Sequence, residues 1–286
     1  MNKKIIISVT CFDNEMEIVN FAKNINKQNN SQRVILVITC NRSCKKDWMI
    51  QELKKIKLQS YVYEPNTNMG YLHGCLYGLK KFERIEDYEW VMISNTDITF
   101  KSQDFFSSFV EKNIDNSIFC VAPKIVLSNG KYQNPFLIER PKNIKILFWR
   151  FILGNKHLYK IYNSLSEIKK IGVENSNKKT NDIDIAKEIY AAHGSCFFIR
   201  KGVVDESLSC TGNENIFMYG EEIFIAEIIR KLKKKVIYYP DLYVNHNENS
   251  TTSKIDYDKK SIWYKKSYRF IYKSFFKNKN DKLQLK

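Results

Sequence analysis

Short apolar runs alternate with amphipathic segments through the first hundred residues, and this alternation limits the possible folds more than any other feature. The apolar runs, read as strands, span 4–10, 33–39, 61–63 and 90–94. The segments with apolar residues at helical spacing span 15–27, 48–56 and 71–82. Continuous apolar runs are typical of strands buried on both faces, and strand–helix alternation favours a mainly parallel sheet between helices. The sequence therefore predicts an α/β fold.

A polar turn follows each predicted strand. These turns lie at 10–15, 39–44, 66–70 and 95–97. Because parallel strands end at the same edge of a sheet, and ligands bind at the carboxyl ends of such strands, the turns are expected to border a binding site.

The second half of the chain is less regular. A segment at about 131–184 is predicted to be a mobile insertion, with an apolar patch at 144–153 and a polar stretch at 174–182. Regular structure returns with 191–200, a helix at 221–232 and a strand at 235–239 closed by Pro240. The predicted organisation is one domain over 1–253, followed by a basic segment over 254–286.

Asn95 and Asp97 directly follow a buried strand. A carboxylate at a strand end, with an amide two residues earlier, is suited to hold a hard divalent cation against phosphate oxygens. The alternative is an ordinary turn in which Asp97 caps the next segment. His246 follows the last predicted strand and becomes relevant to this site only if it converges on Asp97.

Glu221 and Glu222 open a predicted helix after Gly220. Acidic residues at a helix N-terminus interact favourably with the helix dipole, which is a sufficient structural reason for them. The functional alternative is a general base, because paired carboxylates in a cleft raise one another's pKa.

Four stretches in this order resemble the family-two glycosyltransferases with the GT-A fold, in the rhamnosyltransferase-like branch that builds bacterial surface polysaccharides. The stretches are Pro65-Asn-Thr-Asn68-Met-Gly70-Tyr71 followed by Gly74 and Gly78, Ile93-Ser-Asn95-Thr-Asp97-Ile98, the segment from His193 to Arg200, and residues 217–232 with 238–240 and His246. The resemblance covers roughly residues 4–253. It implies an inverting transferase that moves a sugar from a nucleoside-diphosphate donor to an acceptor hydroxyl.

The resemblance also implies roles for individual residues. It implies that the nucleotide is contacted by Thr10, Asn68 and Gly70. It implies that Mg²⁺ or Mn²⁺ is bound by Asp97, with Asn95 and His246 beside it. Sugar contacts fall to Gly194 and Ser195, with Arg200 sharing the diphosphate charge. The catalytic base is Glu222, with Glu221 as the alternative.

Three residues depart from the family pattern. Asn41 stands near the place of an acid that contacts the nucleotide, and is offered as its substitute. Thr96 replaces a proline, and Glu222 replaces an aspartate. A shift of about 1 Å in a catalytic group costs roughly a hundredfold in rate, so an inactive relative acting as a scaffold remains an alternative.

The formal net charge is +16, and half of it lies in residues 249–286, which hold ten Lys and one Arg against three Asp. As a helix, this segment places Tyr264, Tyr268, Ile271 and Phe275 in one stripe. Basic helices with aromatic anchors bind anionic membranes, whereas the structural alternative is that the stripe packs on the domain. The patch at 144–153 is a candidate second contact, with a lipid-linked acceptor.

No secretory leader or membrane-spanning run is evident, and seven irregularly spaced cysteines suit a reducing compartment. The expected location is the cytoplasm, at the inner face of the cell membrane. A nucleic-acid-binding protein is the rival class, since basic and aromatic residues also bind phosphates and bases. Residues 1–253 contain no segment that resembles a known nucleic-acid-binding module, so no nucleic-acid partner is expected.

Overall fold

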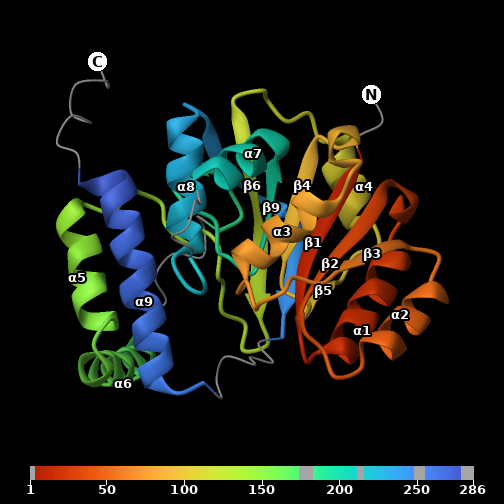
Figure 1. Ribbon diagram of the computed structural model, residues 1–286. Helices are drawn as coiled ribbons and strands as arrows, with labels where there is room; N and C mark the ends of the chain where they lie inside the picture. The colour runs from red at the N-terminus through yellow and green to blue at the C-terminus, as the bar shows by residue number, and fades with distance from the viewer. Residues whose placement is uncertain (1–3, 174–182, 211–215, 248–254, 278–286) are drawn as a thin grey trace.

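The four predicted strands of the N-terminal half pair in parallel and form one side of a single sheet (Figure 1). They are β1 (Ile5–Phe12), β2 (Val34–Arg42), β3 (Gln59–Tyr63) and β4 (Trp90–Ser94). The computed structural model describes residues 4–173, 183–210, 216–247 and 255–277. The predicted parallel arrangement is confirmed, and it brings the polar turns to one edge.

The other side of the sheet is mixed. Its strands are β5 (Ile98–Phe100), β6 (Ile118–Leu127), β7 (Lys187–Ile189), β8 (Cys196–Arg200) and β9 (Lys235–His246). Across the described residues the order is β3-β2-β1-β4-β8-β6-β9-β5, with β7 paired to β9. β8 runs antiparallel to both β4 and β6, and β9 runs parallel to β6. The sheet is therefore a mainly parallel half joined to a mixed half through β8.

Pro240 does not end the last long strand, contrary to the prediction. β9 continues to His246, and its register against β6 shifts between Tyr239 and Tyr243. Proline lacks the N–H that a sheet ladder needs, and a bulge removes that requirement locally. The continuation matters because it carries His246 to the edge where β4 ends.

Helices cover both faces of the sheet, as predicted. They are α1 (Glu15–Asn26), α2 (Lys46–Lys54), α3 (Leu72–Lys81), α4 (Phe105–Glu111), α7 (Lys201–Cys210) and α8 (Glu221–Lys231). Alternate residues of β1 divide between the two faces: Ile5 and Ile7 join the core that includes α1, α2 and α4. Ile6 joins the core that includes α3 and α8. This alternation follows from the two-residue period of a strand.

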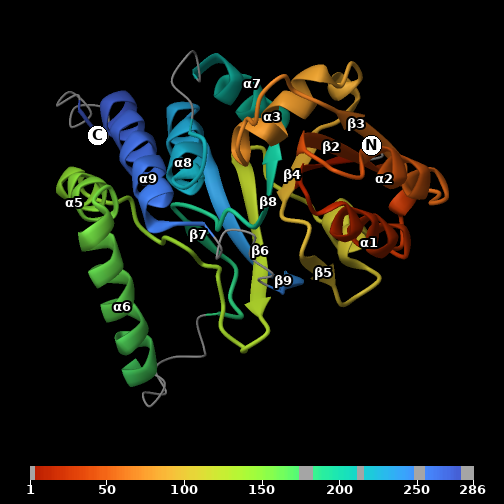
Figure 2. The same cartoon turned by 60° about the horizontal axis from the view of Figure 1, so that its bottom comes forward.

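Three further helices gather at the end of the molecule away from α1 and α2 (Figures 1 and 2). They are α5 (Asn143–Leu153), α6 (Lys156–Val173) and α9 (Tyr257–Ile271), and α9 continues into a π-helical turn, η5 (Tyr272–Phe276). The predicted mobile insertion at 131–184 therefore contains two helices in its described part, and its mobility stays a prediction. The polar stretch 174–182 lies outside the described residues.

The aromatic stripe of α9 packs on the domain. Tyr268 is 8 % exposed and Ile271 is 0 % exposed, and both belong to the same core as α8. Tyr264 and Phe275 are half-buried against that core. The structural alternative for this stripe is confirmed, because all four side chains pack against the domain.

A buried ion pair fastens the C-terminal turn to α8. The guanidinium of Arg140 donates to both carboxylate oxygens of Glu227, at 2.7 and 3.0 Å, and to the carbonyl oxygen of Phe275 at 3.0 Å. The hydroxyl of Tyr190 donates to the same Glu227 at 2.7 Å. Glu227 is 4 % exposed, and a buried carboxylate is tolerated only when it is paired in this way.

Candidate active site

A pocket of about 1200 Å³ opens at the carboxyl ends of β1, β2 and β4. Eleven of the twelve predicted site residues line it. They are Thr10, Asn41, Asn68, Gly70, Asn95, Asp97, Gly194, Ser195, Glu221, Glu222 and His246. The pocket therefore unites all four stretches that the sequence analysis singled out.

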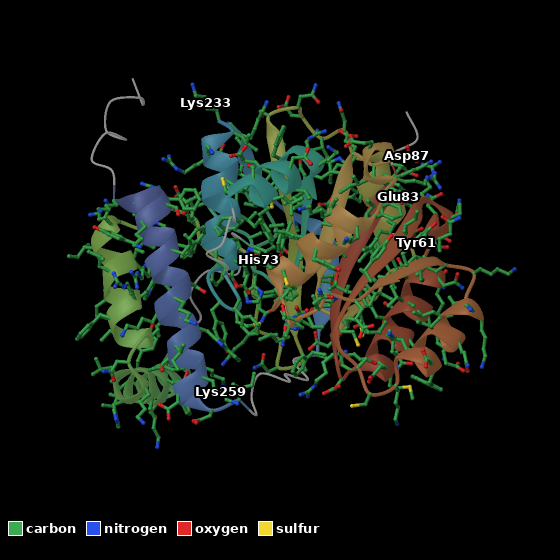
Figure 3. The ribbon with its side chains drawn as sticks, in the orientation of Figure 1. Tyr61, His73, Glu83, Asp87, Lys233 and Lys259 are labelled. Carbon is green, nitrogen blue, oxygen red and sulfur yellow. The ribbon has the colours of Figure 1, made fainter. Side chains whose placement is uncertain are left out.

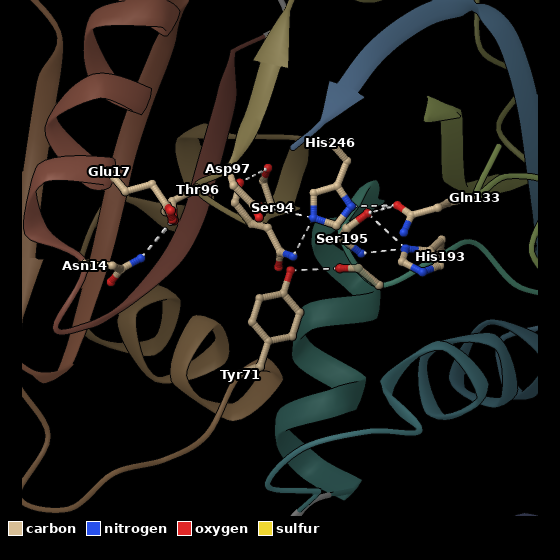
Figure 4. Close-up of polar contacts among 12 residues, drawn as sticks. Asn14, Glu17, Tyr71, Ser94, Thr96, Asp97, Gln133, His193, Ser195 and His246 are labelled. Carbon is tan, nitrogen blue, oxygen red and sulfur yellow. Dashed lines mark hydrogen bonds and ion pairs between the residues drawn. The ribbon is translucent and has the colours of Figure 1, made fainter. Parts of the chain in front are cut away.

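Asp97 and His246 meet within this pocket. The antiparallel register of β5 and β9 sets Ile98 opposite His246. Oδ1 of Asp97 consequently lies 3.1 Å from Nε2 of His246, and the side chains are 10 % and 7 % exposed (Figure 4). His246 therefore converges on Asp97, which was the condition for counting it as a residue of this site.

Asn95 completes the polar contacts at Nε2 of His246. Its Nδ2 donates to that nitrogen at 3.3 Å. Its backbone N–H donates to the carbonyl oxygen of Ser195 at 2.8 Å, which joins the end of β4 to the segment before β8. The Asn95–Asp97 turn is thus fixed by backbone pairing, independently of any ligand.

Gln133 is a pocket residue that sequence reasoning missed. Its Oε1 accepts a hydrogen bond from Nδ1 of His246 at 2.7 Å and one from Oγ of Ser195 at 3.2 Å (Figure 4). The first bond keeps a proton on Nδ1, so when the ring is neutral its lone pair lies on Nε2 and faces Asp97. Gln133 lies in the predicted insertion, with no sequence motif around it.

His193 is a second missed pocket residue. Its Nδ1 accepts from the backbone N–H of Ser195 at 3.2 Å and lies 2.9 Å from that residue's Oγ. Burial, with a smaller contribution from nearby His246, lowers the pKa of His193 to about 3. The ring is therefore neutral at physiological pH. His73, in contrast, lies inside the molecule (Figure 3), with Nδ1 2.9 Å from the carbonyl oxygen of Ile216.

Thr96, the residue in place of a proline, ties the end of β4 to α1. Its hydroxyl donates to the carboxylate of Glu17, and Nδ2 of Asn14 donates to the hydroxyl at 2.9 Å (Figure 4). A proline at this position would lose both bonds. The replacement therefore keeps the turn anchored by a different contact.

The side of the pocket that the sequence predicts to contact a nucleotide is built on the turn at 66–70. Nδ2 of Asn41 donates to the carbonyl oxygen of Gly70 at 2.8 Å, and its Oδ1 accepts from the N–H of Met69 at 2.9 Å. Oδ1 of Asn68 accepts from the N–H of Gly70 at 2.8 Å. Both polar groups of the Asn41 side chain are thus bonded to the turn, so Asn41 supports the pocket wall. A direct contact between Asn41 and a nucleotide would require one of these two hydrogen bonds to break.

An aromatic side chain and a cation lie at the same side. Phe12 is 36 % exposed, and the guanidinium of Arg42 sits 4.2 Å from its ring centroid while pairing with Asp13. Phe12 and Arg42 both line the pocket. A flat aromatic ring beside a cation is chemically suited to a base and a phosphate.

Glu221 and Glu222 line the pocket at the start of α8. Gly220, at φ +88°, turns the chain into the helix. The backbone N–H of Gly194 lies 3.4 Å from Oε1 of Glu222, and Oε2 of Glu221 has no hydrogen-bond partner among the described residues. Burial, and then the charge of Glu222, raises the pKa of Glu221 to about 8, and burial raises the pKa of Glu222.

The side of the pocket next to these carboxylates is aromatic and apolar. Its residues from α5, α9 and the segment before α8 are Trp149, Leu153, Phe217, Met218, Tyr219, Trp263, Tyr264 and Tyr268. The ring of Tyr219 stacks on that of Tyr264 with centroids 4.1 Å apart. The pocket thus has a polar half and an apolar half.

Arg200 is the predicted residue that does not join the site. Its position opposite Trp90 places it at the start of β4, whereas the site lies at the end of β4. There its guanidinium stacks on the Trp90 ring at 4.6 Å, and its Nε donates to the carbonyl oxygen of Ile118 at 2.9 Å. The expected contact with the diphosphate is wrong, because β8 runs antiparallel to β4 and carries Arg200 away from the pocket.

The donor set at Asp97 and His246 fits a hard divalent cation. Among the described residues, no group of three or more His, Cys, Asp and Glu side chains is arranged to hold a metal ion. Mg²⁺ sites at substrate phosphates commonly use one or two protein ligands, with water and phosphate oxygens supplying the others. A carboxylate and an imidazole nitrogen facing one pocket meet that requirement.

No protein-family model and no curated protein matches the sequence. Solved structures do match. Mannosyltransferase PcManGT from Pyrobaculum calidifontis, in complex with GDP-Man and Mn²⁺, superposes with a TM-score of 0.52 at 12 % identity, over 93 % of this chain and 69 % of that one. GalNAc-T7 with UDP, GalNAc and Mn²⁺ gives a TM-score of 0.55 at 12 % identity, over 86 % of this chain and 43 % of that one.

This chain has the GT-A fold. The fold class predicted from the sequence is confirmed. In this GT-A fold the pocket lies where the parallel strands end, and the segments carrying Asp97, Gly194, Glu222 and His246 all reach it.

Proposed function

We propose that this chain is an inverting, metal-dependent glycosyltransferase that moves a sugar from a nucleoside-diphosphate donor to an acceptor hydroxyl. One observation carries the proposal: the Asp97–His246 pair and the Glu221–Glu222 pair line the same pocket of a GT-A fold. The sequence resemblance favours a hexosyl or rhamnosyl donor and a lipid-linked or oligosaccharide acceptor of a surface polysaccharide. It also favours work at the cytoplasmic face of the cell membrane.

Asp97 and His246 are the proposed metal ligands. Mg²⁺ or Mn²⁺ bound there would neutralise the charge that develops on the departing diphosphate. The two solved neighbours named above contain Mn²⁺, which supports a divalent ion. Gln133 positions His246 by keeping the ring proton on Nδ1, and Asn95 flanks the ring at Nε2.

Glu222 is the proposed catalytic base. Burial raises the pKa of both carboxyls, that of Glu221 to about 8, so Glu221 holds a proton at neutral pH and we assign the base to Glu222. Glu222 takes the proton of the acceptor hydroxyl, whose oxygen forms a bond to the anomeric carbon. The bond from that carbon to the diphosphate oxygen breaks on the opposite side, so the configuration inverts.

The two halves of the pocket suit the two substrates. The polar half, with Phe12, Arg42 and the turn at 66–70, suits a nucleoside diphosphate. The apolar half, with Trp149 and Trp263, adjoins Glu221 and Glu222. Aromatic faces pack against the apolar faces of sugar rings and against lipid chains, so this half suits the acceptor.

The test is donor binding followed by turnover. UDP, GDP and dTDP are screened by thermal shift with and without Mn²⁺, because a ligand that binds only the folded state raises the melting temperature. Nucleoside-diphosphate sugars that carry the nucleotide found to bind are then assayed as donors, for sugar transfer and for donor hydrolysis. Metal-dependent stabilisation with turnover supports the proposal, whereas binding without turnover identifies an inactive scaffold. Stabilisation by oligonucleotides instead of nucleotides identifies a nucleic-acid-binding protein.

A further inference from the structure

Helices α5 and α6 expose a set of large apolar side chains. Ile144, Phe148 and Phe151 on α5 are 74 %, 51 % and 67 % exposed, and Ile161 and Leu165 on α6 are 57 % and 54 % exposed. The α5 residues are spaced by four and three positions, which places them on one side of the helix. The α6 pair is spaced by four and also shares one side. We call these five residues the outer face.

The outer face is distinct from the side of α5 that packs inward. Ile146 and Leu153 are buried, and Trp149 is half-buried. Trp149 and Leu153 line the pocket described above. A helix of a water-soluble domain normally has one apolar side, so a second one exposed to solvent indicates a further partner.

The segment that carries the outer face is basic, although one of its cations, Lys156, pairs with Asp258 of α9. Residues 140–166 contain no Asp or Glu, and they contain six basic residues. Arg140 is committed to Glu227, but Lys142, Lys145 and Lys160 are exposed. On the helical period, Lys145 and Arg150 fall on either side of the α5 apolar residues. Apolar side chains bordered by cations complement a surface that is both apolar and anionic.

We propose that the outer face of α5 and α6 binds an anionic lipid bilayer. Figure 2 shows both helices at the outer edge of the molecule, away from α1 and α2. None of the helices in the described part of the chain has the length and apolar character needed to cross a bilayer. The face therefore lies in the interfacial region, with Phe148 and Phe151 among the acyl chains and the lysines at the headgroups.

Charge argues for lipid over a second copy of this chain. A symmetric dimer places the same patch of two subunits together, so Lys142 and Lys145 of one copy would oppose those of the other. Like charges brought together across an interface are unfavourable, whereas anionic headgroups neutralise them.

The location includes the patch at 144–153, which the sequence suggested as a second contact, and not the α9 stripe that it suggested first. The α9 stripe packs against the core, so α9 offers exposed basic side chains, such as Lys265 and Lys266, and one exposed large apolar residue, Ile262. The larger apolar contribution comes from the five residues of α5 and α6. Because α5 also lines the pocket, a bilayer at the outer face would lie next to the acceptor side; this last point rests on the proposed function, whereas lipid binding itself does not.

The experiment is vesicle co-sedimentation of the full chain without donor or metal. Vesicles of phosphatidylcholine are compared with vesicles of phosphatidylcholine and phosphatidylglycerol, at low and high salt. The apolar variant is Phe148→Ser with Phe151→Ser, matched by Met16→Ser, which alters a 58 % exposed residue of α1. The charge variant is Lys142→Glu with Lys145→Glu, matched by Lys54→Glu with Lys57→Glu near α2. Melting temperatures confirm that every variant is folded.

The wild type is expected to bind anionic vesicles, more weakly at high salt. The apolar variant should lower the partition coefficient by about tenfold or more, the charge variant should remove the preference for anionic lipid, and both controls should match the wild type. Absence of wild-type binding, or undiminished binding by the apolar variant, overturns the proposal. The α9 lysines are tested with the variant Lys265→Glu with Lys266→Glu. If vesicle binding is lost only in this variant, the proposal is also overturned. A dimer that the apolar variant dissociates, without vesicle binding, assigns the face to a second copy instead.

Discussion

Oδ1 of Asp97 lies 3.1 Å from Nε2 of His246, although Asp97 is in the turn between β4 and β5 and His246 is the last residue of β9. The pairing of β5 with β9 produces this contact. It places a carboxylate and an imidazole nitrogen at the edge where the parallel strands end, as a pair of metal ligands would require.

Asp97→Asn is expected to weaken Mn²⁺ binding by at least about tenfold, because a neutral amide replaces the charged ligand. Binding is measured from the electron paramagnetic resonance signal of free Mn²⁺. Asp241→Asn is the matched control, since Asp241 is an exposed carboxylate on the same strand as His246. Equal Mn²⁺ affinity in Asp97→Asn and wild type would contradict the metal assignment.

Gln133→Leu is expected to weaken Mn²⁺ binding by roughly tenfold, because loss of a hydrogen bond behind a ligand histidine releases its tautomer and orientation. Gln133→Glu keeps an acceptor for Nδ1 and should restore most of the affinity. Nitrogen-15 chemical shifts of the imidazole report the tautomer directly. An unchanged tautomer in Gln133→Leu would show that Gln133 does not position His246.

Glu222→Gln and Glu221→Gln should differ in transfer rate. Removing a general base costs about 10²- to 10⁴-fold in kcat, so Glu222→Gln is expected to lose that much. Glutamine closely resembles a protonated glutamate, so Glu221→Gln should keep kcat within about fivefold of the wild type. The reverse ranking would assign the base to Glu221.

Glu221 should make the folded protein less stable as pH rises. Its pKa is raised from about 4.5 to about 8, so between these values the folded state holds a proton that the unfolded state lacks. The free energy of unfolding therefore falls as pH rises through this window, and the loss is complete above the folded pKa. Urea denaturation at about pH 5 and about pH 9 should show a smaller decline for Glu221→Gln than for wild type. Glu111→Gln, at an exposed carboxylate, should leave the decline unchanged.

Gly70→Ala should destabilise the fold by about 3 kcal/mol or more. Gly70 has φ +75°, and a Cβ there would collide with the carbonyl oxygen of Phe217, which accepts the N–H of Tyr71 at 3.1 Å. Gly202→Ala is the control, because its Cβ would only touch the Phe119 ring at 3.4 Å within α7. Denaturant unfolding compares the two, and similar stabilities would remove the steric argument.

The local patterns of the N-terminal half predicted its structure well. A buried parallel strand requires a continuous apolar run, and a covering helix requires apolar residues at helical spacing, so β1, β2 and β4 were evident from composition along the chain. The polar turns after these strands indicated the edge of the site. Eleven predicted residues consequently lie in one pocket.

The errors came from strand direction and from long-range contacts. Arg200 ends the same strand that begins near Ser195, but the antiparallel pairing of β8 with β4 carries it to the opposite edge. Gln133 has no motif around it, and its contact with His246 joins residues far apart in the chain. His193 adjoins the predicted Gly194–Ser195 stretch, but its place in the pocket beside His246 is decided by the fold. Pro240 lies within β9, because the register shift between Tyr239 and Tyr243 removes the need for the N–H that proline lacks.

The sequence by itself determined which segments are strands and helices, and which residue types stand at the strand ends, because burial and backbone preference are properties of short stretches. Only the tertiary structure decided which of those ends meet. The order and direction of the strands set His246 against Asp97 and placed Arg200 outside the pocket. The packing of the helices buried the stripe of α9 and left one side of α5 exposed. Such choices depend on packing free energy summed over both cores, which no local pattern contains.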